Sequence, residues 1–170
     1  MQFTRLVVHC DAFRNEFKEP LPEYNEEERS LLNRRDFRKL AGIRIKDAKA
    51  LLKTGRNSSG AYYLAGYAVE CALKACIARK TKAGDWPAKP EEVRKMYSHS
   101  LIELFAFADL ATLRDQEVRN NAVFAGYWGV VKDWSEQKRY EESTQRQAEI
   151  LFTAITDSQN GVLRWIQQYW

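Results

Sequence analysis

The sequence contains little proline, glycine or cysteine. Its 170 residues include 4 prolines and 8 glycines, a scarcity that favours helices over sandwiches of short strands. The 3 cysteines are an odd number without a framework spacing, and no zinc-ligand set accompanies them. A phosphate-cradling glycine loop and a Gly-x-Ser-x-Gly elbow are also missing. We therefore expect neither a metal nor a cofactor.

A signal peptide and a long apolar run are missing as well. Because both are missing, the sequence indicates neither export nor insertion into a membrane. Free cysteines without a framework suit a reducing compartment. We expect a cytoplasmic protein that makes no membrane contact.

The composition is that of a folded chain. Hydrophobic residues make up 45% and charged residues 29%, which predicts a globular domain with one core. The net charge of +4 is compatible with nucleic-acid binding but is too small to indicate it alone.

The stretch 58–81 has the clearest periodicity, and we expect it to be the central helix. Its apolar residues recur every three or four positions. They are Tyr62, Ala65, Val69, Ala72, Leu73, Cys76 and Ile77. Beside them a second stripe follows the same spacing and consists of Tyr63, Tyr67, Glu70 and Lys74. Because the acid precedes the base by four positions, Glu70 and Lys74 are predicted to form a surface ion pair.

The remaining pattern predicts more helices and no sheet. Asp36 is the expected N-cap and Gly55 the expected C-cap of the first one. Ser100 is the expected N-cap of a later helix, with Glu103 completing a Ser-x-x-Glu capping box. The predicted helices span 36–54, a short stretch from 90, a stretch from 100, 115 into 124 or beyond, and 141 almost to the C-terminus. The fold class is therefore all-α. We expect an antiparallel up-and-down bundle of four longer helices with one or two short ones over 36–170.

Residues 1–35 form a separate N-terminal extension or arm in this interpretation. The stretch KEPLPEYNEEER, with two prolines and a run of glutamates, is typical of an exposed linker. The arm packs on the bundle or on a second copy, or it is a partly ordered tail.

Four pieces of sequence resemble the HEPN-domain family over residues 36–170. They are GYAVECALKACIARK (66–80), YSHSLIEL (97–104), WSEQKRYEE (134–142) and AEILFTAITDSQNGVLRWI (148–166). The resemblance implies a HEPN-like helical bundle, a homodimer, and a nucleotide or RNA as ligand. It also implies a toxin–antitoxin pair with a small nucleotidyltransferase, or a defence or RNA-processing system.

Many HEPN proteins are metal-independent ribonucleases that use an Arg, a following polar residue and a His five or six positions later. Arg119 and Asn120 match the first two, but Phe124 stands where the His is expected. Phenylalanine moves no proton, and general acid–base catalysis is worth about a hundred- to ten-thousandfold in rate. The usual nuclease activity is therefore expected to be lost. The alternative for Arg119 and Asn120 is a polar helix face exposed to water.

His99 precedes a predicted helix start, where orienting neighbouring groups is the favoured role. A catalytic His99 would need a second acid or base close by. The candidates for that partner are Tyr67, Glu70 and Tyr140.

The last candidate group contains Arg139, Tyr140 and Trp134, together with Tyr67, Glu70 and Lys74 of the central helix. Arginine binds phosphate with two hydrogen bonds and aromatic rings stack on bases, so these residues suit a nucleotide or RNA pocket beside the central helix. The favoured alternative is core packing by Trp134 and Tyr140, with Arg139 paired to Glu70.

The first helix carries a basic side suited to a phosphate backbone, although a solvated face is the usual meaning of such a run. Its cations are Arg34, Arg35, Arg38, Lys39, Arg44, Lys46, Lys49 and Lys53.

Three functions remain open from the sequence. The first is a HEPN-like protein that binds nucleic acid or nucleotide without the usual ribonuclease activity. The second is a metal-independent endoribonuclease with an atypical site, in which Arg119 and Asn120 act together with His99. The third is an interaction module for a nucleotidyltransferase.

Overall fold

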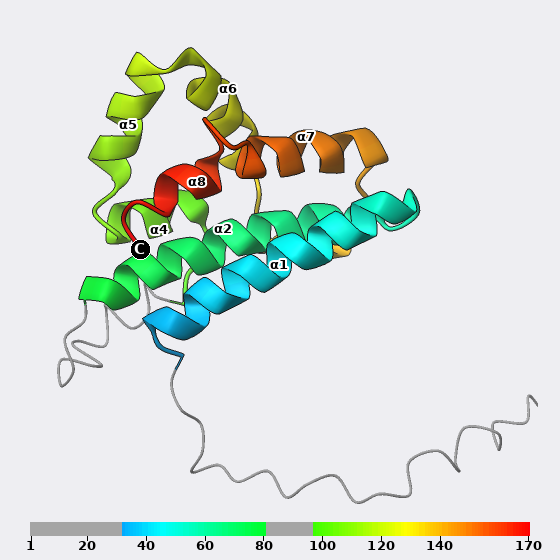
Figure 1. Cartoon of the computed structure of the whole chain (residues 1–170), viewed down its shortest axis with the longest axis horizontal. Coiled ribbons are helices and arrows are strands. Elements are labelled where there is room, and N and C mark those ends of the chain that lie inside the picture. The colour runs from blue at the N-terminus through cyan, green and yellow to red at the C-terminus, as the bar shows by residue number, and fades with distance from the viewer. Residues whose placement is uncertain (1–31, 81–96) are drawn as a thin grey trace, which may run out of the picture. The chain divides into compact units, whose positions relative to one another are not determined.

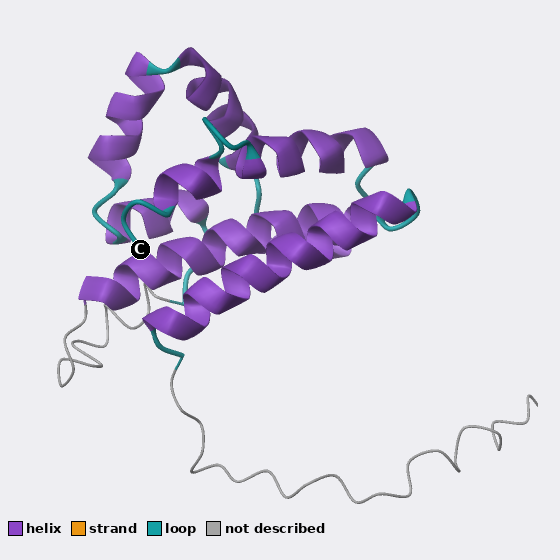
Figure 2. Cartoon of the chain, in the orientation of Figure 1, coloured by secondary structure: helices purple, strands orange, loops and turns teal. Residues whose placement is uncertain are grey.

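A computed structural model describes residues 32–80 and 97–170. Within these ranges the chain forms seven α-helices and one 3-10 helix and no strand. Figure 1 shows how the helices are arranged, and Figure 2 colours them by secondary structure. The predicted all-α class is therefore confirmed. Of the arm predicted at 1–35, residues 1–31 lie outside the described residues, as do Cys10 and the short helix expected from Pro90, whereas Arg34 and Arg35 already belong to the first helix.

Two long helices, α1 (Arg34–Thr54) and α2 (Ser58–Lys80), form an antiparallel hairpin (Figure 1). Gly55 ends α1 as predicted, in the left-handed conformation at φ 64° that glycine adopts without strain. The predicted N-cap is wrong. Asn33 caps α1, and the Asp36 carboxylate accepts a hydrogen bond from the Asn33 N–H at 3.0 Å, which completes a capping box.

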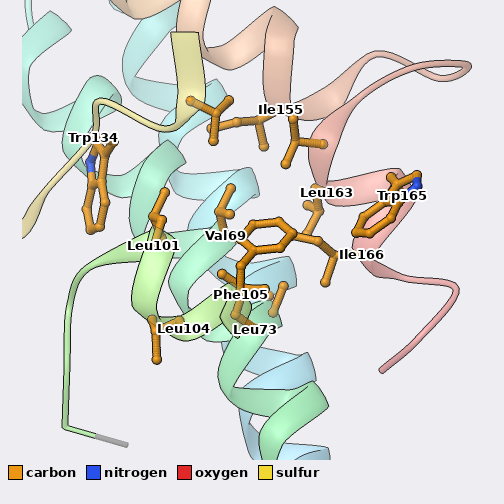
Figure 3. Packing of buried hydrophobic residues seen from close by; sticks show 14 of the residues in the cluster. Val69, Leu73, Leu101, Leu104, Phe105, Trp134, Ile155, Leu163, Trp165 and Ile166 are labelled. Atoms are coloured by element: carbon orange, nitrogen blue, oxygen red, sulfur yellow. The ribbon is translucent and has the colours of Figure 1, made fainter. Parts of the chain in front are cut away.

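The helix α2 lies at the centre of the fold, as predicted. Small and apolar side chains are buried on nearly every side of it because α1, α4 (Leu101–Phe107), α7 (Gln145–Thr156) and α8 (Val162–Ile166) all contact it. Figure 3 shows the core around Val69 and Leu73, where Phe105 of α4 packs against Trp165 and Ile166 of α8.

The helix predicted from 115 into 124 or beyond is wrong, because the chain breaks at Asn121. It forms α5 (Ala111–Asn120) and α6 (Ala122–Val131) instead. The Asn121 backbone is extended, at φ −134° and ψ 98°, and its side-chain oxygen accepts the Phe124 N–H at 3.0 Å. Its amide donates to Asn160 Oδ1 at 2.9 Å. A side chain that caps a new helix competes with continuing the old one.

The prediction of one long helix from 141 almost to the C-terminus is also wrong. The chain forms α7 (Gln145–Thr156) and α8 (Val162–Ile166), separated by a turn in which Asp157 Oδ1 accepts two backbone N–H groups. A β-carbon at Gly161 would come within 2.5 Å of the Asp157 carbonyl oxygen, so the turn requires glycine there. The connection between α6 and α7 contains the 3-10 helix η3 (Glu136–Tyr140). The two predicted long helices of this half are thus replaced by shorter ones.

Candidate functional site

The carboxylate of Glu70 is the centre of a polar cluster in the middle of α2. Its side chain is 1% exposed, yet Lys74 Nζ lies 2.8 Å from Oε1, and His99 Nδ1 lies 3.0 Å from Oε1 and 3.1 Å from Oε2. The predicted ion pair of Glu70 and Lys74 therefore forms, but it is buried and not on the surface as predicted. A buried carboxylate is tolerated only with partners that offset its lost hydration, and both partners are present.

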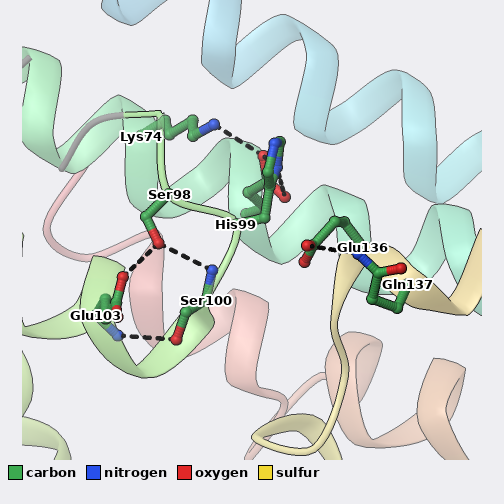
Figure 4. A network of polar contacts seen from close by, with 8 residues as sticks. Lys74, Ser98, His99, Ser100, Glu103, Glu136 and Gln137 are labelled. Atoms are coloured by element: carbon green, nitrogen blue, oxygen red, sulfur yellow. Dashed lines mark hydrogen bonds and ion pairs between the residues drawn. The ribbon is translucent and has the colours of Figure 1, made fainter. Parts of the chain in front are cut away.

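The segment before α4 holds His99 in this position (Figure 4). Ser100 caps α4 as predicted, with its hydroxyl accepting the Glu103 N–H at 3.4 Å. The Glu103 carboxylate does not complete the capping box but accepts the Ser98 hydroxyl at 2.6 Å. The His99 side chain remains 45% exposed. The structure thus places one nitrogen of a half-exposed imidazole against a buried carboxylate. Of the three candidate partners of His99, the one that contacts its ring is Glu70.

Two half-buried tyrosines continue this cluster along α2. We call Tyr63, Tyr67, Glu70 and Lys74 the α2 stripe. The rings of Tyr63 and Tyr67 stack at 6.0 Å and 17°, and the Arg44 guanidinium of α1 lies 5.8 Å from the Tyr67 centroid. Burial is the main cause that raises the Tyr67 pKa. The hydroxyl therefore stays neutral and able to donate or accept a hydrogen bond.

Arg139 and Tyr140 lie at the tyrosine end of the α2 stripe. Tyr140 is 75% exposed and the Arg139 guanidinium lies 4.8 Å from its ring centroid. A hydrogen bond with Tyr140, and a weaker contribution from one with Tyr63, raise the pKa of Arg139. Core packing by Tyr140 does not fit this exposure. Pairing of Arg139 with Glu70 is not found within the described residues, where Glu70 contacts Lys74 and His99.

Trp134 lies beneath the tyrosines and not on the surface. It is 2% exposed, and its ring centroid is 5.9 Å from that of Tyr63. A β-carbon at Gly66 would come within 2.2 Å of Trp134 Cδ1, so the ring occupies the space above that glycine. Trp134 therefore matches the core-packing alternative, and direct stacking on a ligand does not fit its burial.

Arg119 and Asn120 are exposed in the last turn of α5. Figure 1 shows α5 and α6 rising away from α2. Within the described ranges no hydrogen bond or ion pair joins either residue to the Glu70 cluster. Phe124, in the place of the expected His, is 1% exposed and packs 5.6 Å from the Trp165 ring. The structure thus brings together His99, Glu70 and Lys74, with Tyr67 alongside, but not the Arg119 segment.

The sequence did not point to Arg44 or Glu136 as parts of this site. Glu136 of η3 faces the cluster in Figure 4, and His99 is among the minor causes that lower its pKa, after its own backbone hydrogen bond. The helical spacing of Arg44 and Asp47 indicates their ion pair, which forms at 3.0 Å, but not the contact of Arg44 with the Tyr67 ring.

Among residues 32–80 and 97–170 no group of His, Cys, Asp and Glu side chains is arranged to hold a metal ion. In the same ranges no helix has both the length and the apolar character needed to span a bilayer. Comparisons with protein-family models, curated proteins and solved structures find no match to this chain.

Proposed function

We propose that this chain binds RNA or a nucleotide at the α2 stripe and the Arg139–Tyr140 pair. The observation that carries the proposal is the exposed Tyr140 ring with a guanidinium 4.8 Å from its centroid, adjoining a stacked tyrosine pair. Aromatic rings beside cations are the usual platform for unpaired bases and their phosphates.

Each group has a defined part in this proposal. Tyr140 stacks on a base, and Arg139 binds the adjoining phosphate with two hydrogen bonds. Lys74 contributes a positive charge at the other end of the stripe, and His99 contributes its half-exposed imidazole. The buried Glu70 carboxylate holds both of them in place.

The proposal also includes a HEPN-like fold and a biological system in which the protein acts. An antiparallel α1–α2 hairpin and the ordered set of four motifs support a HEPN-like bundle that forms a homodimer. A core phenylalanine at 124 supports binding without the usual ribonuclease chemistry. The biological setting is then a toxin–antitoxin pair with a nucleotidyltransferase, or a defence or RNA-processing system.

A metal-independent endoribonuclease is the second candidate, because Glu70 orients the half-exposed imidazole of His99. With Nδ1–H donated to the carboxylate, Nε2 is left as a base. Nε2 takes the proton of a ribose 2′-hydroxyl, and the freed oxygen attacks the neighbouring phosphorus. A 2′,3′-cyclic phosphate forms, and the leaving 5′-oxygen takes a proton from water.

Binding and cleavage of a short labelled RNA, with chelator present, test both candidates in the full chain. We expect Tyr140→Ala and Arg139→Ala each to weaken binding about tenfold, in line with the usual loss of one base stack. Two exposed residues on other helices serve as matched controls, Ile150→Ala and Arg164→Ala, and we expect a change below about twofold from each.

The outcomes separate the candidates. Binding that responds to Tyr140 and Arg139, without cleavage, supports the first. Cleavage that disappears in His99→Ala and in Glu70→Gln supports the second. Neither binding nor cleavage, together with stable association with a nucleotidyltransferase, contradicts both and leaves the interaction module.

A further inference from the structure

The eight cations of the basic side of α1 divide into two groups. Three of them make contacts inside the fold. Arg34 Nη2 donates to the Trp170 carbonyl at 2.6 Å, and the Arg38 guanidinium lies 5.3 Å from the Trp170 ring. Arg44 pairs with Asp47 at 3.0 Å. The other five are exposed and have no ion pair within the part of the chain that the structure describes: Arg35, Lys39, Lys46, Lys49 and Lys53.

These five cations, which we call the basic line, share one face of α1. Gly42 falls on the same face, so the line advances by alternating steps of four and three residues. A step of seven residues returns to within about 20° of the same direction on an α-helix. From position 35 to position 53 the line is about 27 Å long at 1.5 Å per residue. Asp36 and Asp47 lie off this face, since the first is in the capping box and the second pairs with Arg44.

The basic line and the α2 stripe lie on opposite sides of α1. Ala41 and Ala48 mark the face that packs in the core. At about 100° per residue, the line is centred roughly 120° from that face in one direction, and Arg44 lies roughly 60° from it in the other. Arg44 is the residue that contacts Tyr67, so the line points away from the α2 stripe. An inference about the line therefore does not rest on a ligand at the stripe.

We propose that the basic line binds the phosphate backbone of a nucleic-acid strand. A single file of like charges without an interleaved acid repels itself and attracts a polyanion. The cations follow one another at about 4.5 to 6 Å along the helix, with one gap of about 10.5 Å across Gly42, and such a row suits a ligand whose charges are also arranged in a row. A membrane surface fits less well, because an interfacial helix needs a free apolar face, and that face of α1 is buried at Ala41 and Ala48.

The test is the salt dependence of RNA binding by the full chain. The triple variant K46Q/K49Q/K53Q is compared with K132Q/R146Q/R164Q, which removes three exposed charges elsewhere and leaves the same net charge. Affinity for a labelled oligouridine is measured between about 50 and 200 mM salt. Each phosphate contact contributes about −0.7 to the slope of log K against log salt for a single strand. We expect the slope to become shallower by about 2 in the line variant and by less than about 0.5 in the control.

Three results would overturn the inference. Equal slopes in both triple variants would mean that only net charge matters, and absence of RNA binding would remove the partner. Competition by poly-glutamate as effective as that by unlabelled oligouridine would assign the line to acidic proteins. Binding at the α2 stripe is distinguished from binding at the basic line by Tyr140→Ala. This variant is expected to lower the affinity for RNA without changing the slope of log K against log salt.

Discussion

Nδ1 of His99 lies 3.0 Å from one oxygen of Glu70 and 3.1 Å from the other, so the ring nitrogen bridges a buried carboxylate. The two residues are 29 positions apart and join the middle of α2 to the segment before α4. This contact serves both the fold and the candidate site, and it is the basis of the first prediction.

Glu70→Ala is expected to destabilise the fold by about 3 kcal/mol, the usual scale for removing one partner of a buried ion pair. The variant leaves Lys74 and His99 without their carboxylate and opens a cavity in the core. Urea unfolding measures the change. Lys74→Ala is the matched comparison. It should cost less, because His99 still contacts Glu70. Equal losses in both variants would contradict this account.

Gly66→Ala tests the contact with Trp134. A β-carbon would come within 2.2 Å of Cδ1, and the ring is buried and unable to withdraw, so we expect a loss of about 1–3 kcal/mol. Gly126→Ala in α6 is the control, because nothing lies within 4 Å of its added β-carbon. Its midpoint of thermal unfolding should rise, since alanine favours a helix by up to about 1 kcal/mol. A neutral Gly66→Ala would mean that the ring does not fill that space.

Asn121→Ala should destabilise the junction of α5 and α6 by about 1 kcal/mol, the usual value of an N-cap. It removes the bond to the Phe124 N–H and the one to Asn160. The neighbouring Asn120→Ala is the control. Asn120 is exposed, so its replacement should change the free energy of unfolding by less than about 0.5 kcal/mol. If the two variants behave alike in chemical denaturation, Asn121 is not the cap that divides these helices.

The two buried thiols predict a fall in stability at alkaline pH. Burial raises the pKa of Cys71 from 9.0 to about 12 and that of Cys76 from 9.0 to about 11. Above pH 9 the unfolded chain loses these protons while the folded chain keeps them, so rising pH favours unfolding until the folded pKa is reached. Each thiol contributes about 1.4 kcal/mol per pH unit in that range.

Cys71→Ala checks this sign by unfolding at pH 8 and pH 10. The loss of stability between the two pH values should be smaller than in the unmodified chain by about 1.4 kcal/mol. Cys76→Ala should behave similarly. An identical loss in all three proteins would show that the thiols ionise equally in the folded and unfolded states.

Much of the candidate site follows from spacing along α2. Tyr63, Tyr67, Glu70 and Lys74 lie on one stripe because of the helical period, and the structure keeps them there. Whether the Glu70–Lys74 pair is exposed or buried does not follow from spacing. It depends on the segment of His99, which is distant in sequence and covers the carboxylate.

The all-α class, the central helix, the end of α1 at Gly55 and the cap at Ser100 were determined by the sequence itself, because periodicity and capping act within a few residues. Tertiary structure alone decided the break at Asn121, the turn before Gly161 and the burial of Trp134. The physical reason is that the free energy of continuing a helix differs little from that of ending it and capping a new one. Contacts from remote residues, such as that of Asn160 with Asn121, are large enough to decide between them.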